Sequence, residues 1–354
     1  MKRYVLLIAL GLAGCATENT AETEPITDEG DDTTDYGNEP DPDRGPYAME
    51  DPEAALAAIP EEMRPAEMLD ALKAHLLVPD VSSGGRAMFT DIVSIEAGQD
   101  ITFCTYLDYV TDDVLYVHDT LGSQTAHGHH AILQYLTVPQ EPGTRACPDD
   151  SDLDAQLGQI LGGTGGEGNG AIVLPANVVS EVPAGAQLVI NHHWINTGEE
   201  AIDAQAEMIT VPPESDEDLI IARAMVVAAT DFDIAPGAQG EASTECTFPS
   251  ETQLLSMIGH QHQWGSHVRA ERLGEDAEMI FDHDYTPEMI SQPITTDFSL
   301  DAPFRFGAGE TVRMSCNWDN TSEEALTFPR EMCILFGWQI GADEDTRCIN
   351  GTWL

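Results

Sequence analysis

Basic residues are scarce in this chain of 354 residues, where 14 Lys and Arg stand against 63 Asp and Glu. Lys2 and Lys73 are the only lysines, and the formal net charge is −49. A protein that binds a polyanion needs a basic surface to displace counterions, so this composition argues against nucleic acid, and against an anionic membrane surface, as a partner of the folded part. The acidity favours a surface adapted for solubility; the alternative is attraction of a cationic substrate.

Apolar runs long enough to cross a membrane are also missing near the N-terminus. The run over residues 4–12 is too short to span a bilayer. It follows Lys2 and Arg3 and ends in small residues before Cys15, a pattern typical of a bacterial lipoprotein signal peptide over residues 1–15. We expect an exported protein that is anchored through lipidated Cys15 to the outer membrane or cell surface of a bacterium. The alternative is an ordinary cleaved signal peptide with a chance cysteine.

Cysteine pairs of the C-x-x-C type are absent, which leaves a thioredoxin-like or zinc-ribbon protein without support. Apart from Cys15 there are six cysteines, and an even number in an exported chain predicts three disulfides. The sequence by itself leaves all fifteen pairings open. The six are Cys104, Cys147, Cys246, Cys316, Cys333 and Cys348.

The N-terminal part of the mature chain lacks apolar residues. Residues 16–50 contain 12 acids against the single base Arg44, a composition that cannot form a core and predicts a disordered acidic tether. Over residues 51–80, Leu and Met recur at helical spacing, which predicts an extension that is either helical or loosely ordered.

Short alternating runs separated by Pro and Gly follow, and they predict β-sandwiches. A polar run that begins with two prolines at 212 and 213 divides a first unit, residues 81–214, from a second, residues 215–354. The clearest expected strands are residues 91–95, 101–107, 188–190 and 208–211.

Histidines gather in three short clusters, at residues 127–130, 192–193 and 260–262. On a strand, residues i and i+2 share a face, so His260 and His262 are expected to converge on one ion. The adjacent pair before Ala131 needs a bulge for both rings to face one side. One such pair alone is usually ordinary surface chemistry, but three clusters together favour a metal site.

Imidazole ligands suit Cu, Zn, Fe and Ni, whereas a thioether sulfur selects a soft ion, chiefly Cu(I). A methionine that completes the His260/His262 pair would therefore indicate copper. Five methionines are candidates on this reasoning: Met257, Met279, Met289, Met314 and Met332.

Four short motifs occur in the order found in one known family. Residues 129–133 (HHAIL) resemble its HHxxL motif, and residues 193–197 (HWINT) resemble HYxN(T/P), with Trp194 in place of Tyr. Residues 260–265 (HQHQWG) resemble HxHxxG, and residues 331–333 resemble EMC. From about residue 90 onward the chain thus resembles the type II copper, ascorbate-dependent monooxygenases, which include peptidylglycine α-hydroxylating monooxygenase and dopamine β-monooxygenase.

The resemblance implies an all-β chain of two tandem jelly-roll-like sandwiches, each with a copper site, facing across an interdomain cleft. It implies a monomeric enzyme that uses ascorbate as electron donor and dioxygen as co-substrate to hydroxylate an activated C–H bond of a small molecule. The implied ligands of the electron-transfer copper are His129, His130 and His193, and those of the copper that uses dioxygen are His260, His262 and Met332.

The resemblance also implies the disulfides Cys104–Cys147, Cys246–Cys348 and Cys316–Cys333. On the chain-entropy model, the last of these closes a short loop and stabilises the fold by roughly 3 kcal/mol. It would also hold Met332 in place, which matters because methionine is a flexible ligand.

Three positions depart from the peptide-hydroxylating branch. Where that branch has an Arg, an Asn and a Tyr that hold the carboxylate of the substrate, this chain has Ile258, Ile334 and Phe336. Burying a carboxylate without a polar partner is costly, so we expect a neutral, aromatic or cationic substrate and not peptidylglycine. An alternative from another class of protein uses the same ligands, namely a surface lipoprotein that binds and buffers copper without catalysis.

Overall fold

The computed structural model describes residues 47, 49, 51–147, 158–165, 168–286, 289 and 294–354. Cys15, the expected signal peptide over residues 1–15 and nearly all of the tether over 16–50 lie outside the described residues. In the described part, no helix is long and apolar enough to cross a membrane. Strands make up most of the regular structure, as the sequence predicted.

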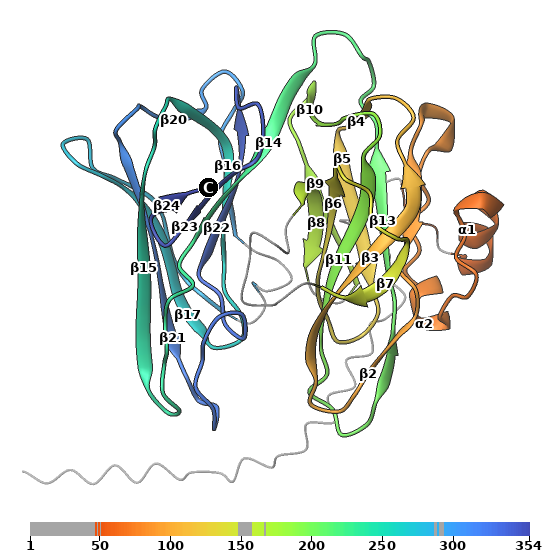
Figure 1. Ribbon diagram of the computed structural model, residues 1–354, viewed down its shortest axis with the longest axis horizontal. Coiled ribbons are helices and arrows are strands. Elements are labelled where there is room, and N and C mark those ends of the chain that lie inside the picture. Colours follow the sequence, from red (N-terminus) through yellow and green to blue (C-terminus); the bar gives the residue numbers. More distant parts are fainter. Residues whose placement is uncertain are drawn as a thin grey trace, which may run out of the picture. The chain divides into compact units, whose positions relative to one another are not determined.

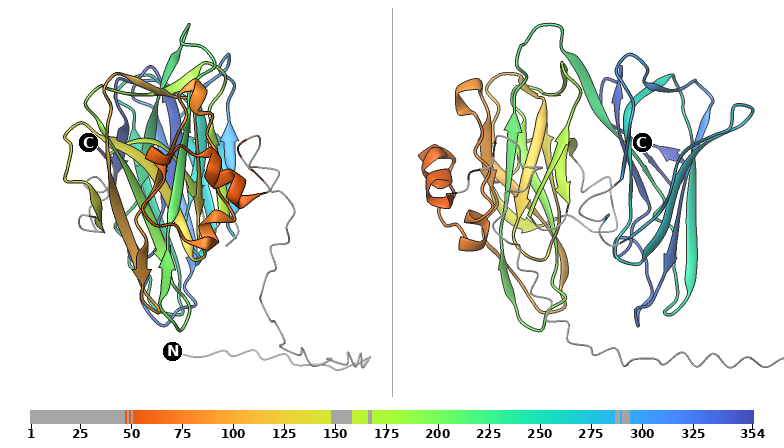
Figure 2. Two further views of the ribbon diagram at one scale, coloured as in Figure 1. Left: turned by 90° about the vertical axis from the view of Figure 1, so that its right-hand side faces the viewer. Right: turned by 180° about the vertical axis from the view of Figure 1, so that it is seen from behind.

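The segment over residues 51–80 forms two short helices, α1 (Pro52–Ala58) and α2 (Asp70–Lys73), with a 3-10 turn between them. The Asp51 carboxylate caps α1 by accepting from the backbone N–H of Glu53 and Ala54. Pro60 and Pro65 interrupt the helical spacing, because proline lacks the N–H that a helix interior needs. Both helices lie beside the first sandwich (Figure 2), and their apolar side chains are buried against one of its sheets.

The first sandwich consists of two antiparallel sheets with the strand orders β1-β13-β5-β9 and β7-β3-β11-β6-β8 (Figure 1). Its core includes Leu133, Leu188, Ile190, Trp194 and Met208, all fully buried. The strands of this half are β1 (Arg86–Phe89), β2 (Val93–Ile95), β3 (Asp100–Val110), β4 (Leu115–Val117), β5 (Asp119–Gln124), β6 (Gly128–Leu136), β7 (Gly143–Ala146), β8 (Gln159–Gly165), β9 (Gly168–Val173), β10 (Val178–Val182), β11 (Gln187–Ile195), β12 (Ile202–Ala204) and β13 (Ala206–Val211).

The second sandwich packs the sheet β15-β21-β17-β18 against a sheet that contains β19, β16, β22 and β14. Its core includes Met257, Phe306, Met314, Trp318 and Leu335. The strands of this half are β14 (Ile220–Ala228), β15 (Gln239–Thr247), β16 (Thr252–His260), β17 (Gly265–Leu273), β18 (Glu278–Asp284), β19 (Thr295–Asp297), β20 (Phe304–Phe306), β21 (Thr311–Asp319), β22 (Ile334–Ile340), β23 (Thr346–Ile349) and β24 (Thr352–Trp353).

One sheet runs through both halves. Strand β10 of the first half pairs in parallel with β14 of the second, through Val178 opposite Ile220 and Val179 opposite Ile221. This join extends the β16-β22-β14 sheet into β10 and β4 to give nine strands. A third apolar cluster contains side chains from both halves, among them Ile160, Leu174, Val226, Ile334 and Trp338.

The three disulfides have the predicted pairing. Cys104–Cys147 links β3 to the end of β7, and Cys246–Cys348 links β15 to β23. Cys316–Cys333, 17 residues apart, fastens the segment before β22 to β21. Each bridge therefore stays within one half of the molecule, and the third fixes the backbone next to Met332.

A partly buried carboxylate also connects the two halves. The side chain of Asp345 accepts hydrogen bonds from the backbone N–H of Ile160 in β8 (2.6 Å) and of Ala224 in β14 (2.9 Å). Its own N–H donates to the side chain of Gln159 (3.0 Å). Burial raises the pKa of Asp345 to about 6, although these hydrogen bonds and two nearby arginines oppose the rise.

Replacing Asp345 with Ala should lower the free energy of unfolding at pH 7 by about 2 kcal/mol, because two buried N–H groups lose their acceptor. The folded-state pKa lies above the usual value, so the stabilisation from protonating Asp345 is complete below pH 3.8 and is lost as the pH rises through 6. The difference between wild type and Asp345→Ala should therefore widen as the pH falls from 7 to 4, by at most about 1.4 kcal/mol per unit. Urea unfolding at several pH values measures it.

Asp343→Ala is the matched control, since Asp343 is exposed and only two residues away. It should cost less than about 0.5 kcal/mol, with no change between pH 7 and 4. A difference for Asp345→Ala that narrows as the pH falls would contradict the raised pKa of Asp345.

Candidate metal centre

A bulge places two adjacent histidines on one side of the first sandwich. In the pairing of β6 with β11, His130 lies opposite His193 and Gly128 lies opposite Trp194, so His129 is the extra residue of the bulged strand. The ring centroids of His129 and His130 are 5.2 Å apart. The kink that the sequence required for an adjacent pair is therefore present.

His260 and His262 reach each other in a different way from the one the sequence suggested. Strand β16 ends at His260, and His262 lies in the turn that follows, so the expectation of one continuous strand is wrong. The turn is held by Gln261, whose side-chain amide donates to the His267 carbonyl (2.6 Å) and whose own carbonyl accepts from the Tyr285 hydroxyl (2.6 Å). The two imidazole centroids are nevertheless 5.2 Å apart.

All five histidines lie in a single cluster that contains residues from both halves. The His129 ring is 4.8 Å from His193, 5.7 Å from His260 and 4.2 Å from His262, between centroids. Two sets of three have ligand atoms within 4.8 Å of one another, and His129 belongs to both. One set is His129, His130 and His193, as the sequence proposed; the other is His129, His260 and His262.

In His193 and His262, a hydrogen bond to one ring nitrogen determines which nitrogen offers its lone pair to the cluster. His193 Nε2 lies 2.5 Å from an oxygen of Asp100, which accepts, so Nε2 holds the proton and Nδ1 the lone pair. His262 Nδ1 donates to the Arg330 carbonyl (2.9 Å), which leaves the lone pair on Nε2. Both lone-pair nitrogens, and Nε2 of His129, are buried without a hydrogen-bond partner among the described residues.

Burial favours the neutral form of four of the five imidazoles. Burial, with the neighbouring histidines, lowers the pKa of His129, His130 and His262 well below the usual value, and it lowers that of His260 to about 4. A buried nitrogen without a partner costs about 1–3 kcal/mol, which a metal ion bound to the lone pair would offset. Neutral nitrogen donors with carboxylate or carbonyl support behind them fit copper or zinc.

Glu331 attaches the segment around Met332 to the turn that holds His262. Its fully buried carboxylate accepts from the backbone N–H of His262 (3.0 Å), Trp264 (3.1 Å) and Met332 (3.2 Å), and from the Trp318 indole (2.7 Å). Burial raises the pKa of Glu331 to about 7 against the opposing effect of these donors. The backbones of His262 and Met332 thus share one carboxylate.

The side chain of Met332 is nearly buried and belongs to the apolar cluster with Ile334, Trp338 and Phe336. Sequence reasoning proposed Met332 and missed Glu331 and Asp100. Glu331 belonged to the EMC motif but had no predicted role of its own, and Asp100 carried no signal.

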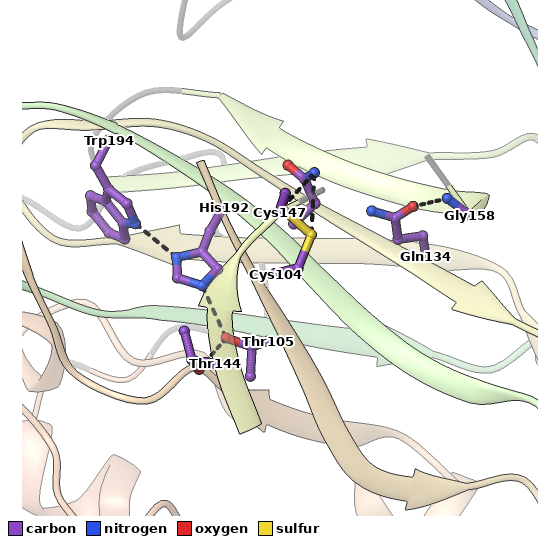
Figure 3. Close-up of a disulfide and its surroundings, with 9 residues drawn as sticks. Cys104, Thr105, Gln134, Thr144, Cys147, Gly158, His192 and Trp194 are labelled. Carbon is purple, nitrogen blue, oxygen red and sulfur yellow. Dashed lines mark hydrogen bonds between the residues drawn. A yellow bond between two sulfur atoms is a disulfide. The ribbon is translucent and has the colours of Figure 1, made fainter. Parts of the chain in front are cut away.

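His192, the neighbour of His193 on β11, is fully buried and lies between Trp194 and Thr105 (Figure 3). The Trp194 indole donates to His192 Nδ1 (2.7 Å), so Nε2 carries the proton and donates to the Thr105 hydroxyl (2.9 Å), which in turn bonds Thr144. Burial lowers its pKa to about 3. With both ring nitrogens in hydrogen bonds to Trp194 and Thr105, His192 offers no free nitrogen to a metal ion.

Comparisons with known proteins assign no family. No family model and no curated protein matches the chain. Among solved structures, the major capsid protein P2 of bacteriophage PM2 is 8% identical, with 73% of this chain and 98% of that chain covered and a TM-score of 0.29. The STIV MCP is 6% identical, with 72% and 95% covered and the same TM-score. The CUB1-EGF-CUB2 domains of rat MASP-1 are 7% identical, with 70% and 96% covered and a TM-score of 0.16. At these scores the likeness assigns no function.

Proposed function

We propose that this protein is a copper- and ascorbate-dependent monooxygenase that hydroxylates an activated C–H bond of a small organic substrate. The observation that carries the proposal is the cluster of five histidines, three of which have a buried ring nitrogen with no hydrogen-bond partner among the described residues. Three of the four ordered motifs agree with it, since their histidines, far apart in the sequence, meet in this cluster.

When bound, copper supplies one-electron chemistry between ascorbate, dioxygen and the substrate. His129, His130 and His193 would hold one ion, with Asp100 orienting the His193 ring. His260, His262 and Met332 would hold the other, and the thioether of Met332 favours the reduced ion there. The Arg330 carbonyl and the Glu331 carboxylate keep His262 in one orientation.

The substrate side of the second site is apolar. On the paired strands β16 and β22, Ile258 lies opposite Phe336 and His260 lies opposite Ile334, so these side chains share one face of the sheet. The Phe336 ring is 6.2 Å from the His260 ring between centroids. This surface supports a neutral, aromatic or cationic substrate, and it gives the carboxylate of a peptidylglycine no partner from those three positions.

We further propose that the chain is an exported, monomeric lipoprotein held at a bacterial surface through Cys15. The three disulfides suit an oxidising compartment, and the signal pattern over residues 1–15 supplies the anchor.

Oxygen uptake with copper and ascorbate tests the proposal. Uptake should depend on an added substrate such as a phenethylamine, and the product should contain one oxygen atom from labelled dioxygen. A peptide ending in glycine should give little product. If copper binds and no compound of a broad neutral and aromatic panel is hydroxylated, the protein instead buffers copper.

A further inference from the structure

His129 is the residue through which the two histidine groups meet. The bulge in β6 places it between two pairs of histidines. One pair is His130 and His193 from its own half, and the other is His260 and His262 from the second half. Its closest ring in the cluster is His262, with centroids 4.2 Å apart and the planes at 88°. His129 is almost fully buried there, and its Nε2 has no hydrogen-bond partner within the part of the chain that the structure describes.

His129, His260 and His262 therefore form a three-nitrogen set that differs from either copper site proposed above. Their ligand atoms lie within 4.8 Å of one another. A tetrahedral ion with Zn–N bonds of about 2.0–2.1 Å needs its nitrogens about 3.3 Å apart, so small side-chain rotations close the set. The lone pair on His262 Nε2 is fixed by the Arg330 carbonyl on the other side of the ring.

We propose that one divalent ion of the zinc type binds His129, His260 and His262 and so joins the two halves of the chain. Three neutral imidazoles with one open position are a ligand set that zinc uses widely. A thioether is a poor ligand for such an ion, so Met332 stays out of this site, whereas reduced copper exchanges His129 for Met332.

This site has a consequence for the proposed enzyme, although it does not depend on it. An ion at the shared set takes His129 from one copper site and His260 and His262 from the other. Zinc should therefore block copper loading, and one bound zinc ion should prevent both copper ions from binding. The binding itself needs neither copper nor turnover, so it can be tested even if no hydroxylation is found.

Zinc titration of the metal-stripped full chain tests the proposal. Calorimetry should show one strong equivalent per chain, with tetrahedral absorption when Co²⁺ replaces Zn²⁺. His129→Ala, His260→Ala and His262→Ala should each weaken binding at least about 100-fold, since loss of a supporting partner alone costs 10–100-fold. Met332→Leu and His193→Ala should change affinity less than about threefold, because neither residue is in the set.

Two results would overturn the site. Weak binding in His193→Ala with wild-type binding in His260→Ala would place the ion in the first half. Weak binding in Met332→Leu with wild-type binding in His129→Ala would place it at the thioether.

Each variant is first checked for its three disulfides and its melting temperature without metal. If His129→Ala does not fold, His129→Gln is used, and zinc should raise the melting temperature of the wild type but not of this variant.

Discussion

Met332→Ile is expected to reduce hydroxylation at least about 100-fold while one copper per chain remains bound. Isoleucine fills a similar volume in the apolar cluster but offers no sulfur, so the second site loses the ligand that favours the reduced ion. In the proposed ligand scheme Met332 binds only the second copper ion. His129, His130 and His193 should therefore keep the first. Product analysis and copper content of the same preparation measure both effects.

Met279→Ile is the matched control for this variant. Met279 was a candidate ligand by sequence, yet it is 47% exposed on β18, so its replacement should leave turnover and copper content unchanged. Full activity of Met332→Ile would show that the thioether is not a ligand.

Glu331→Ala is expected to lower the free energy of unfolding by about 3 kcal/mol. Four N–H donors lose one buried acceptor, and each orphaned donor costs about 1–3 kcal/mol, offset in part because a buried carboxylate is removed. The turn that carries His262 also loses its attachment to Met332, so metal affinity should fall as well. Urea unfolding and copper titration measure the two losses.

Glu324→Ala is the control for the loss of a negative charge in the same segment. Its carboxylate is exposed and pairs with Arg330 at the surface, so removal should cost less than about 0.5 kcal/mol. Equal effects of Glu331→Ala and Glu324→Ala would contradict the role given to the buried carboxylate.

The strands and the local shape of the first histidine group follow from short-range patterns. Alternation predicted the segments that form β3 and β13, and the adjacency of His129 and His130 required the bulge that is found. The helical spacing of residues 51–80 was a weaker guide, because two prolines divide it. The disulfide pairs came from the resemblance, since six cysteines alone allow fifteen pairings.

The supporting residues could not be predicted because their roles depend on distant partners. Asp100 meets His193 across 93 residues, and Glu331 meets His262 across 69. An acid in a strand or beside an apolar run has no distinctive pattern before the chain folds. The turn at His262 was missed for a related reason, because it is held by His267 in β17 and by Tyr285, the residue after β18.

The shared position of His129 was also invisible in the sequence. Nothing in the two motifs indicates that they approach each other, because the approach depends on β10 pairing with β14 and on Asp345 bridging β8 and β14. These contacts set the distance between histidines that belong to different halves.

Copper content of the reduced protein tests the central proposal most directly. Wild type should hold two copper ions per chain, and His193→Ala and His260→Ala should each hold one. Their double variant should hold none. A wild type that binds a single ion, or a single substitution that removes both, would contradict two separate copper sites in this cluster.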